Sequence, residues 1–392
     1  MERSPDASSR GVEWLLQLPA RGADAPFHEV AGWPAACVAY VPMRLPARAL
    51  AAALLVAAAL LSPASASAGG TRPSSSRVRL AGPGTARSAS TLLRGHRRQR
   101  RAGMAVRGRR LRFTGVKGRD VYNPTRPFVI GGRRILAARV ESRASETDSR
   151  VVFFEESRSG WRPVDGAPSP ALQDPFVTAI GDQVLFGGVE VQEQPGGRLR
   201  YRTVFHRGRS LGGLTRFAVG PWGMKDIRVA PMADGRVIVL TRPQGARGGR
   251  GKIGYTVLDS LDHLTPQAIG RGRIIDGQFA DGEWGGANEI VPLGGDRFGV
   301  LGHIARFDAR GARHYYPVAF TIDAQSGQVS PMRTLVERRD LSGGLTGASK
   351  RGDLRDVLFS GGLERHGDGT ATLYVGAGDA EVHAVRIADP FR

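Results

Sequence analysis

The chain has 392 residues, 41% hydrophobic and 23% charged, and this composition is typical of a globular protein rather than a disordered one. Its single cysteine excludes an internal disulfide framework and a metal site built from several cysteines. The formal net charge is +20, but residues 1–119 hold 20 basic and 5 acidic residues, whereas residues 120–392 are nearly balanced at 36 against 31. We therefore expect no nucleic-acid partner for the folded part.

An export signal is the first recognisable feature of the chain. Arg44 and Arg48 precede an apolar run of 13 residues at 49–61, and small residues of the kind that signal peptidase accepts follow it. Such a run makes about 20 Å of helix, short of the roughly 30 Å hydrocarbon core, so we expect no stable membrane anchor. We predict a signal-peptide-like segment at 43–68.

Two methionines offer alternative starts to the chain. A start at Met43 would make residues 1–42 a mis-called or disordered extension, and the protein would be secreted or periplasmic. A start at Met104 would remove the signal-like segment and leave a cytoplasmic protein. We favour Met43; Ala-rich low complexity without any membrane role is the alternative interpretation of the apolar run.

A basic segment follows the signal-like one. Residues 69–119 contain 15 basic residues and no acidic residue. The run at 94–101 could bind polyanions or a membrane surface, but it has no hydrophobic periodicity. We predict that residues 69–112 are a disordered, solvated linker.

One pattern then recurs five times between residues 113 and 392: a polar residue, an apolar strand, a Gly/Asp turn and a second apolar strand. In the second copy, Asp174-Pro175 leads into an apolar strand that turns at Gly181-Asp182. Further apolar stretches lie between the hairpins, and no long helical period is present. Four-stranded units of about 40–50 residues repeated in this way are the signature of a β-propeller. We predict an all-β protein, a single-domain five-bladed β-propeller at 113–392 with a disordered N-terminal extension.

Polar residues begin the first strand of each repeat, and in a propeller these innermost strands surround one central channel. We expect a ring formed by Asn123, Asp174, Asp226, Asn288 and Asp356. Other polar side chains follow the second strands or adjoin the ring, and we assign them to substrate binding: Arg139, Glu141, Lys225, Arg242, His303 and Asp379. Asp and Asn are common turn residues, so strand capping is an equal alternative for any single member. Together they predict a polar binding cavity.

Motifs of other enzyme classes do not fit. The glycine spacing at 249–254 leads into a strand, unlike a dinucleotide-binding loop, which leads from a strand into a helix. The chain has no phosphate-binding Walker loop and no HExxH or nucleophile-elbow motif. Its eight histidines are scattered, so we expect no metal site.

With the ring in view, residues 113–390 resemble the β-1,2-mannosyltransferase/phosphorylase family, formerly a domain of unknown function, which is related to the β-mannoside phosphorylases of the glycoside hydrolases. The resemblance rests on blocks in register: Gly118–Pro124, Arg139–Glu141, Gln173–Phe176, Gly223–Arg228, Trp284–Glu289, Gly302–Ala305, Asp356–Gly362 and Leu373–Ala380. The related phosphorylases carry their proton donor in a Glu-Asp-Pro-Arg motif. Asp174 matches its Asp, whereas Gln173 and Phe176 replace the neighbours, so this chain lacks the family's phosphate-binding Arg at that place.

The resemblance implies an inverting β-mannosyl phosphorylase or mannosyltransferase with Asp174 as the catalytic acid, acting through a substrate hydroxyl. Its partners would be a β-mannooligosaccharide and either inorganic phosphate or GDP-mannose, with no cofactor. Because phosphate is already an anion, the site would need cations rather than a second carboxylate base. Two alternatives stay open: a phosphate-independent β-mannoside hydrolase using Glu141 or Asp226 as base, and a non-catalytic glycan-binding propeller.

Overall fold

The structure, a computed structural model, describes residues 78–79, 86–145, 147–341 and 349–392. These residues all belong to one compact unit of the chain. The segments predicted at 1–42 and 43–68 lie outside the described residues, as does most of 69–85. Among the residues described, no helix is long and apolar enough to cross a membrane.

Four sheets form in the described part of the chain, and the first two are antiparallel meanders in chain order. The first has the order β3-β5-β6-β7, with β4 also pairing with β5; the second has the order β11-β10-β9-β8. Their strands are β3 (Asp120–Tyr122), β4 (Phe128–Ile130), β5 (Arg133–Glu141), β6 (Arg150–Ser157), β7 (Gly160–Pro163), β8 (Gln173–Ile180), β9 (Gln183–Gln194), β10 (Arg198–Gly208) and β11 (Thr215–Val219).

The third sheet has the order β1-β15-β14-β13-β12, in which β1 pairs parallel to β15. The fourth joins two meanders, β16-β17-β18-β19 and β20-β21-β22-β2, through a short parallel pairing of β18 with β20. Their strands are β1 (Val78–Arg79), β12 (Arg228–Pro231), β13 (Val237–Thr241), β14 (Gly254–Leu258), β15 (Arg273–Asp276), β16 (Trp284–Pro292), β17 (Arg297–Phe307), β18 (Arg313–Asp323), β19 (Arg333–Thr334), β20 (Asp356–Arg365), β21 (Thr370–Ala377), β22 (Glu381–Ala388) and β2 (Arg107–Arg110).

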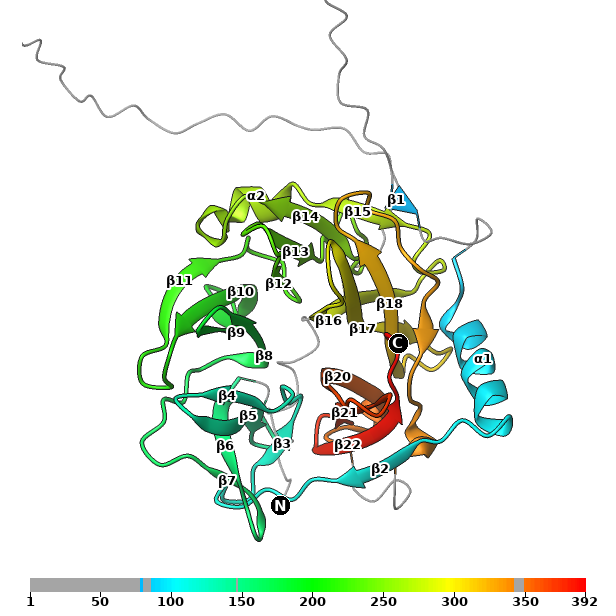
Figure 1. Cartoon of the computed structure of the whole chain (residues 1–392). Helices are drawn as coiled ribbons and strands as arrows, with labels where there is room; N and C mark the ends of the chain where they lie inside the picture. The colour runs from blue at the N-terminus through cyan, green and yellow to red at the C-terminus, as the bar shows by residue number, and fades with distance from the viewer. Residues whose placement is uncertain (1–77, 80–85, 146, 342–348) are drawn as a thin grey trace, which may run out of the picture. The chain divides into compact units, whose positions relative to one another are not determined.

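The first strands of the meanders lie next to one another. Strand β8 contacts β12, β16 and β20, and β16 contacts β12 and β20, although β8, β12 and β16 belong to three different sheets. In Figure 1 the sheets of the unit that contains them stand around these strands, with β7 and β11 on the outside. Residues far apart in the sequence therefore meet where the first strands begin.

Apolar packing between the sheets holds this arrangement together. Strand centres are buried on both faces, as in β5 and β13, and their side chains form clusters that bridge neighbouring sheets. One such cluster joins Phe153 of β6 to Phe186 of β9, with ring centroids 5.0 Å apart. Strands that are buried on both faces have continuous apolar sequences, and these apolar runs make the repeats recognisable in the sequence. The all-β prediction is confirmed.

Helical structure is limited in the described residues. The helices are α1 (Ala89–Arg101) and α2 (Pro266–Gly270), with 3-10 turns η2 (Leu261–His263), η3 (Arg338–Asp340) and η4 (Gly352–Leu354). Helix α1 begins at Ser88, whose side chain accepts a hydrogen bond from the Thr91 backbone N–H.

The prediction of a disordered linker at 69–112 is wrong for its described part. Helix α1 buries Ala89, Leu92 and Leu93 in the core, and β2 pairs antiparallel with β22. Ala89, Leu92, Leu93 and His96 recur at helix spacing and form the buried face of α1. This pattern is hard to recognise in the sequence, because the run at 94–101 is strongly basic. Acidic partners elsewhere in the chain compensate part of its charge.

Candidate active site

Three of the five predicted ring residues share an unusual backbone conformation. Asn123, Asp174 and Asp226 have φ values of +46°, +47° and +58°, in the left-handed region. Asn and Asp adopt this region more readily than other non-glycine residues, so the backbone helps to dictate the residue type. Strained residues of this kind gather at functional sites. The structure therefore supports both interpretations of these residues, as turn formers and as site residues.

Asp174 lies at the centre of the buried polar cluster. Its Oδ1 accepts a hydrogen bond from Asn123 Nδ2 at 2.8 Å and lies 3.5 Å from Arg139 Nη1. Its Oδ2 lies 3.8 Å from the ammonium of Lys225. The side chains of Asp174 and Arg139 are each only 7% exposed, whereas that of Lys225 is 33% exposed. Of these three charged side chains, that of Lys225 is therefore the most exposed to solvent.

These neighbours set the ionisation of Asp174. Burial acts to raise the pKa of its carboxyl, but Arg139, Lys225 and the Asn123 hydrogen bond together hold that pKa below its ordinary value. Burial acts to lower the pKa of Lys225, and Asp174 and Asp226 outweigh it, so that pKa is raised. At neutral pH the site holds an ionised carboxylate between two cations.

Glu141 forms a buried ion pair with Arg139. Its Oε1 lies 2.9 Å from Arg139 Nη2, and Tyr122, Ser149 and Lys350 also donate hydrogen bonds to this fully buried carboxylate. Burial acts to raise the pKa of Glu141, but Arg139 and Lys350 lead the contacts that lower it. Glu141 is a buried counter-ion that fixes Arg139 against Asp174.

Asp226 forms a second buried ion pair. Its Oδ2 lies 3.3 Å from Arg242 Nη1, and both side chains are 3% exposed. Burial acts to raise the pKa of Asp226, but Arg242 and Lys225 lower it to about 2. Arg228 extends the same cluster: its Nε donates to the Asn288 carbonyl at 2.6 Å and its guanidinium lies 4.3 Å from the Phe176 ring centroid.

Asn288 and His303 form the neutral side of the cluster. His303 Nδ1 lies 2.8 Å from Asn288 Oδ1, which also accepts from Ser360 Oγ at 3.0 Å. Burial lowers the pKa of His303 to about 3, so its imidazole is neutral at pH 7 and offers hydrogen bonds rather than charge. Asn288 Nδ2 is buried and has no hydrogen-bond partner within the described part of the chain.

The structure does not bring Asp356 into this cluster. Its Oδ2 is bonded to His314 Nδ1 at 2.6 Å and to the Tyr316 hydroxyl at 2.5 Å, at the pairing of β18 with β20. The strand irregularity found at Asp174 in β8 and at Asn288 in β16 falls at Gly361 in β20. The prediction aligned the fifth repeat on its first acidic residue, Asp356. The position that corresponds to Asp174 and Asn288 is Gly361, five residues later.

Asp379 adjoins the site. It has φ of +52°, and its charge helps to raise the pKa values of Tyr122 and Arg139. Glu190 of β9 pairs with Arg202 at 2.7 Å and Arg216 at 2.8 Å, away from Asp174 and its neighbours.

Sequence reasoning missed several residues of the cluster. They are Tyr122, Ser149, Arg228, Tyr315, Lys350 and Ser360. Tyr315 stacks on His303 with ring centroids 5.4 Å apart. Lys350 carried one available signal: it is one of only 4 lysines in the chain. The other five missed residues stand in no recognisable sequence pattern.

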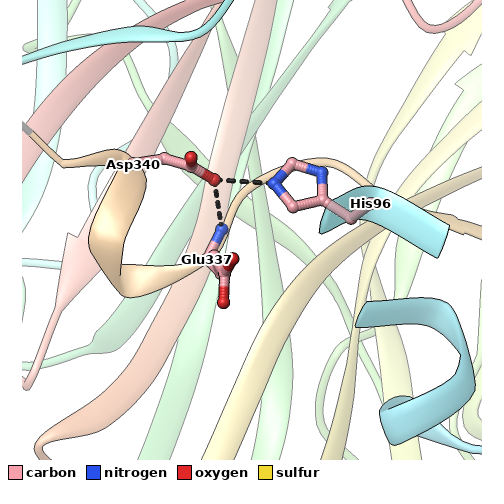
Figure 2. A group of neighbouring side chains, drawn as sticks. All are labelled: His96, Glu337 and Asp340. Carbon is pink, nitrogen blue, oxygen red and sulfur yellow. Dashed lines mark hydrogen bonds and ion pairs between the residues drawn. The ribbon is translucent and has the colours of Figure 1, made fainter. Parts of the chain in front are cut away.

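A separate acidic and histidine cluster holds α1 in place. His96, Glu337 and Asp340 are buried and offer metal-ligating atoms within 4.8 Å of one another (Figure 2). His96 Nε2 contacts Asp340 Oδ2 at 2.7 Å, while Arg97 lies 2.7 Å from Glu337 and Arg100 lies 3.0 Å from Asp340. Both carboxylates are therefore neutralised by arginines of α1. This cluster docks the helix.

The central cluster has the chemistry of a site for a polyhydroxylated, partly anionic substrate. Asn288 and His303 supply neutral hydrogen-bonding groups, and Lys225 supplies a partly exposed charge. Asp174 is the carboxylate that pairs with the partly exposed Lys225, whereas Glu141 and Asp226 pair with the buried cations Arg139 and Arg242.

Comparisons with known proteins agree with this chemistry. The chain is similar to a mannose phosphorylase from Leishmania mexicana, solved with phosphate ion, at 31% identity over 76% of this chain and 93% of that one, with a TM-score of 0.69. It is similar to a GDP-Man-dependent mannosyltransferase from the same organism at 29% identity, over 78% and 95% of the two chains, also at a TM-score of 0.69.

A more distant likeness concerns the fold alone. A β-1,2-mannobiose phosphorylase from Listeria innocua, solved with β-1,2-mannobiose, shares 16% identity over 69% of this chain and 91% of that one, with a TM-score of 0.51. No curated protein matches the sequence. The predicted resemblance and the prediction of an enzyme are confirmed by the two Leishmania structures.

The family described as "Protein of unknown function (DUF1861)" matches residues 97–392, which include every residue of the central cluster. This chain belongs to the DUF1861 family.

Proposed function

We propose that this chain is an inverting β-mannosyl phosphorylase or mannosyltransferase that acts on β-1,2-linked mannosides. One observation carries the proposal: a buried, ionised Asp174 lies between Arg139 and a partly exposed Lys225. A carboxylate that handles the proton and cations that hold an anionic group are the two requirements of mannosyl exchange with phosphate. The two similar enzymes from Leishmania mexicana use phosphate and GDP-mannose, which share that anionic group.

In phosphorolysis, Asp174 gives a proton to the leaving glycosidic oxygen, directly or through a substrate hydroxyl. A phosphate oxygen attacks the anomeric carbon from the opposite ring face, so the C–O bond to the departing sugar breaks as the C–O bond to phosphate forms. The products are mannose 1-phosphate and the shortened mannoside. In the reverse direction, Asp174 accepts the proton of the acceptor hydroxyl.

The ion pairs around Asp174 suit this double role. In the free enzyme Arg139 and Lys225 hold the carboxyl ionised, which is the form needed for a base in synthesis. Bound phosphate would offset the charges of the same cations, raise the pKa of Asp174 and so favour the protonated form needed in phosphorolysis. We assign phosphate binding to Lys225, Arg139 and Arg242, and sugar hydroxyls to Asn123, Asp226, Asn288 and the neutral His303.

The hydrolase alternative is less well supported. It needs a carboxylate free to activate water on the face opposite Asp174. Glu141 and Asp226, the two candidates, are fully buried or nearly so, and each is held by buried cations.

We also infer that the five meanders are the blades of a five-bladed propeller. The contacts among β8, β12, β16 and β20 support this arrangement, as do the repeated strand irregularities at Asp174, Asn288 and Gly361. Inner strands that converge in this way would place all repeats around one site.

The test is incubation of the full chain with β-1,2-mannobiose, with and without phosphate, and with mannose 1-phosphate or GDP-mannose plus mannose. Phosphate-dependent mannose 1-phosphate supports phosphorolysis, and product from GDP-mannose alone selects the transferase. Free mannose without phosphate dependence would select the hydrolase, and unchanged substrate in all arms would leave only glycan binding.

A lysine pair tests the assigned phosphate site. Lys225→Met should raise the KM for phosphate at least about tenfold, since a charge-assisted hydrogen bond is worth about 1.5–3 kcal/mol. The matched control is Lys252→Met, because Lys252 is exposed on the segment before β14. Equal KM values for the two variants would remove Lys225 from the phosphate site.

A further inference from the structure

The β9–β10 hairpin extends beyond the site on the side where Asp174 lies. Strand β8 begins at Gln173, which pairs with Val189 of β9, and Val189 pairs in turn with Thr203 of β10. The hairpin continues past this level from Glu190 to Arg202, without a β8 partner, for about 16 Å of strand. Figure 1 shows β9 and β10 next to β8 in one sheet.

A short segment returns along this hairpin towards the catalytic cluster. The Gly220 N–H donates to the Thr203 carbonyl at 2.8 Å, Gly223 N–H to the Tyr201 carbonyl at 2.8 Å, and Thr203 N–H to the Met224 carbonyl at 3.1 Å. Gly223 has φ of +79°, a turn that a glycine makes without strain. The segment ends at Lys225, whose ammonium lies 3.8 Å from Asp174.

Trp222 stands on this segment and is 38% exposed; among the described residues, only it and Val129 are large exposed hydrophobic side chains. The guanidinium groups of Arg200 and Arg202 lie 4.0 and 4.2 Å from the Trp222 ring centroid. Two residues, Gly223 and Met224, separate Trp222 from Lys225, so their Cα atoms lie at most about 11 Å apart. An exposed indole is thus fixed within reach of an extended ligand that leaves Asp174.

We propose that Trp222 and Arg200 form a sugar-binding platform for an uncharged acceptor chain, one sugar or more beyond the bond handled at Asp174. This inference rests on the proposed function. A pyranose ring would pack its C–H face on the indole, and the Arg200 N–H groups would donate to its hydroxyls. Arg200 is exposed, and surface cation–π contacts are weak, so its side chain can move aside for the sugar.

The polar groups around Trp222 can hydrogen-bond to sugar hydroxyls. Arg202 pairs with Glu190 at 2.7 Å, and Glu190 also binds Arg216. Arg200 bonds the neutral Gln192 at 2.8 Å. The Gln192 amide and the guanidinium groups over the indole thus offer both acceptors and donors to a sugar.

The test compares binding of β-1,2-mannobiose and β-1,2-mannotriose by calorimetry without phosphate, using the full chain. Trp222→Ala should weaken mannotriose binding about tenfold, the size of an aromatic contact, and change mannobiose binding much less. Trp222→Phe should keep most of the preference for the longer glycan. Val129→Ala, the other exposed hydrophobic position, should change neither affinity.

Several results would overturn the platform. They are equal loss of affinity for both glycans in Trp222→Ala, no loss for either, absence of glycan binding by the wild-type chain, or weakened GDP binding with mannotriose binding intact. The melting temperature of each variant separates misfolding from lost contact, and Trp222→Phe keeps the test valid should the alanine variant misfold. A wild-type chain that binds mannotriose through Trp222, but forms neither mannose 1-phosphate from mannosides nor a mannoside from GDP-mannose or mannose 1-phosphate, would refute the proposed function and leave the platform standing.

Discussion

Replacement of Glu141 by glutamine tests the buried charge network that fixes Arg139. The substitution keeps the shape of the side chain and removes the charge that faces Arg139 and Lys350, both buried. Removing one partner of a buried ion pair costs about 3–5 kcal/mol, because the remaining charge is left uncompensated. For a folded unit of this size, each kcal/mol lowers the melting temperature by roughly 2–4 °C, so we expect a fall of about 6–20 °C.

Circular dichroism during thermal and urea unfolding measures this effect. Asp182→Asn is the matched control, since Asp182 pairs with Arg209 at 2.6 Å but both side chains are more than two-thirds exposed, and we expect no measurable change. Adding Lys350→Met to Glu141→Gln should restore part of the loss, because it removes one of the uncompensated cations. Unchanged unfolding in Glu141→Gln would refute the assignment of this network as the support of Arg139.

Three further predictions concern packing, α1 and pH. In Gly376→Ala the new Cβ would lie 2.2 Å from Asn123 Oδ1, so we expect about 1–3 kcal/mol of destabilisation and reduced turnover. The control is Gly367→Ala, whose Cβ would lie in open space and which should behave as wild type in unfolding and activity assays. A chain beginning at Met104 loses α1 and leaves Glu337 and Asp340 without Arg97 and Arg100, so it should melt well below a chain beginning at Ala86; equal melting temperatures would contradict the docking of α1. The pKa of Asp174 lies below its ordinary value and that of His303 at about 3, so kcat/KM for synthesis should stay flat from about pH 5 to 7, and an acidic limb near pH 6 would contradict the ionised Asp174.

The strand repeats and the strand-starting residues could be predicted because their signals are local. Inner strands buried on both faces leave continuous apolar runs, and the left-handed backbone at Asn123, Asp174 and Asp226 selects Asn or Asp. The sequence did not indicate which repeats stay in register. Asp356 resembles the other strand-starting residues, but the irregularity of its strand falls at Gly361, so Ser360 contacts Asn288 instead.

Long-range contacts explain what sequence reasoning missed. Lys350 reaches Glu141 across 209 residues, and Arg97 reaches Glu337 across 240, and neither pairing leaves a local pattern. The arginine-rich helix therefore looked like a solvated tail, because its acidic partners lie in η3. The five predicted cationic and acidic residues do lie in the cluster: Lys225 and Asp226 precede the inner strand β12, Arg139 and Glu141 lie at the end of β5, and Arg242 follows β13.

Formation of mannose 1-phosphate by wild type and Asp174→Asn, measured side by side with β-1,2-mannobiose and phosphate, tests the central claim most directly. We predict phosphate-dependent product from the wild type and a loss of about 10²–10⁴-fold in the variant, whose melting temperature stays close to wild type. Near-normal turnover in Asp174→Asn would contradict the account, because the carboxylate held by Asn123, Arg139 and Lys225 would then have no part in the proton transfer.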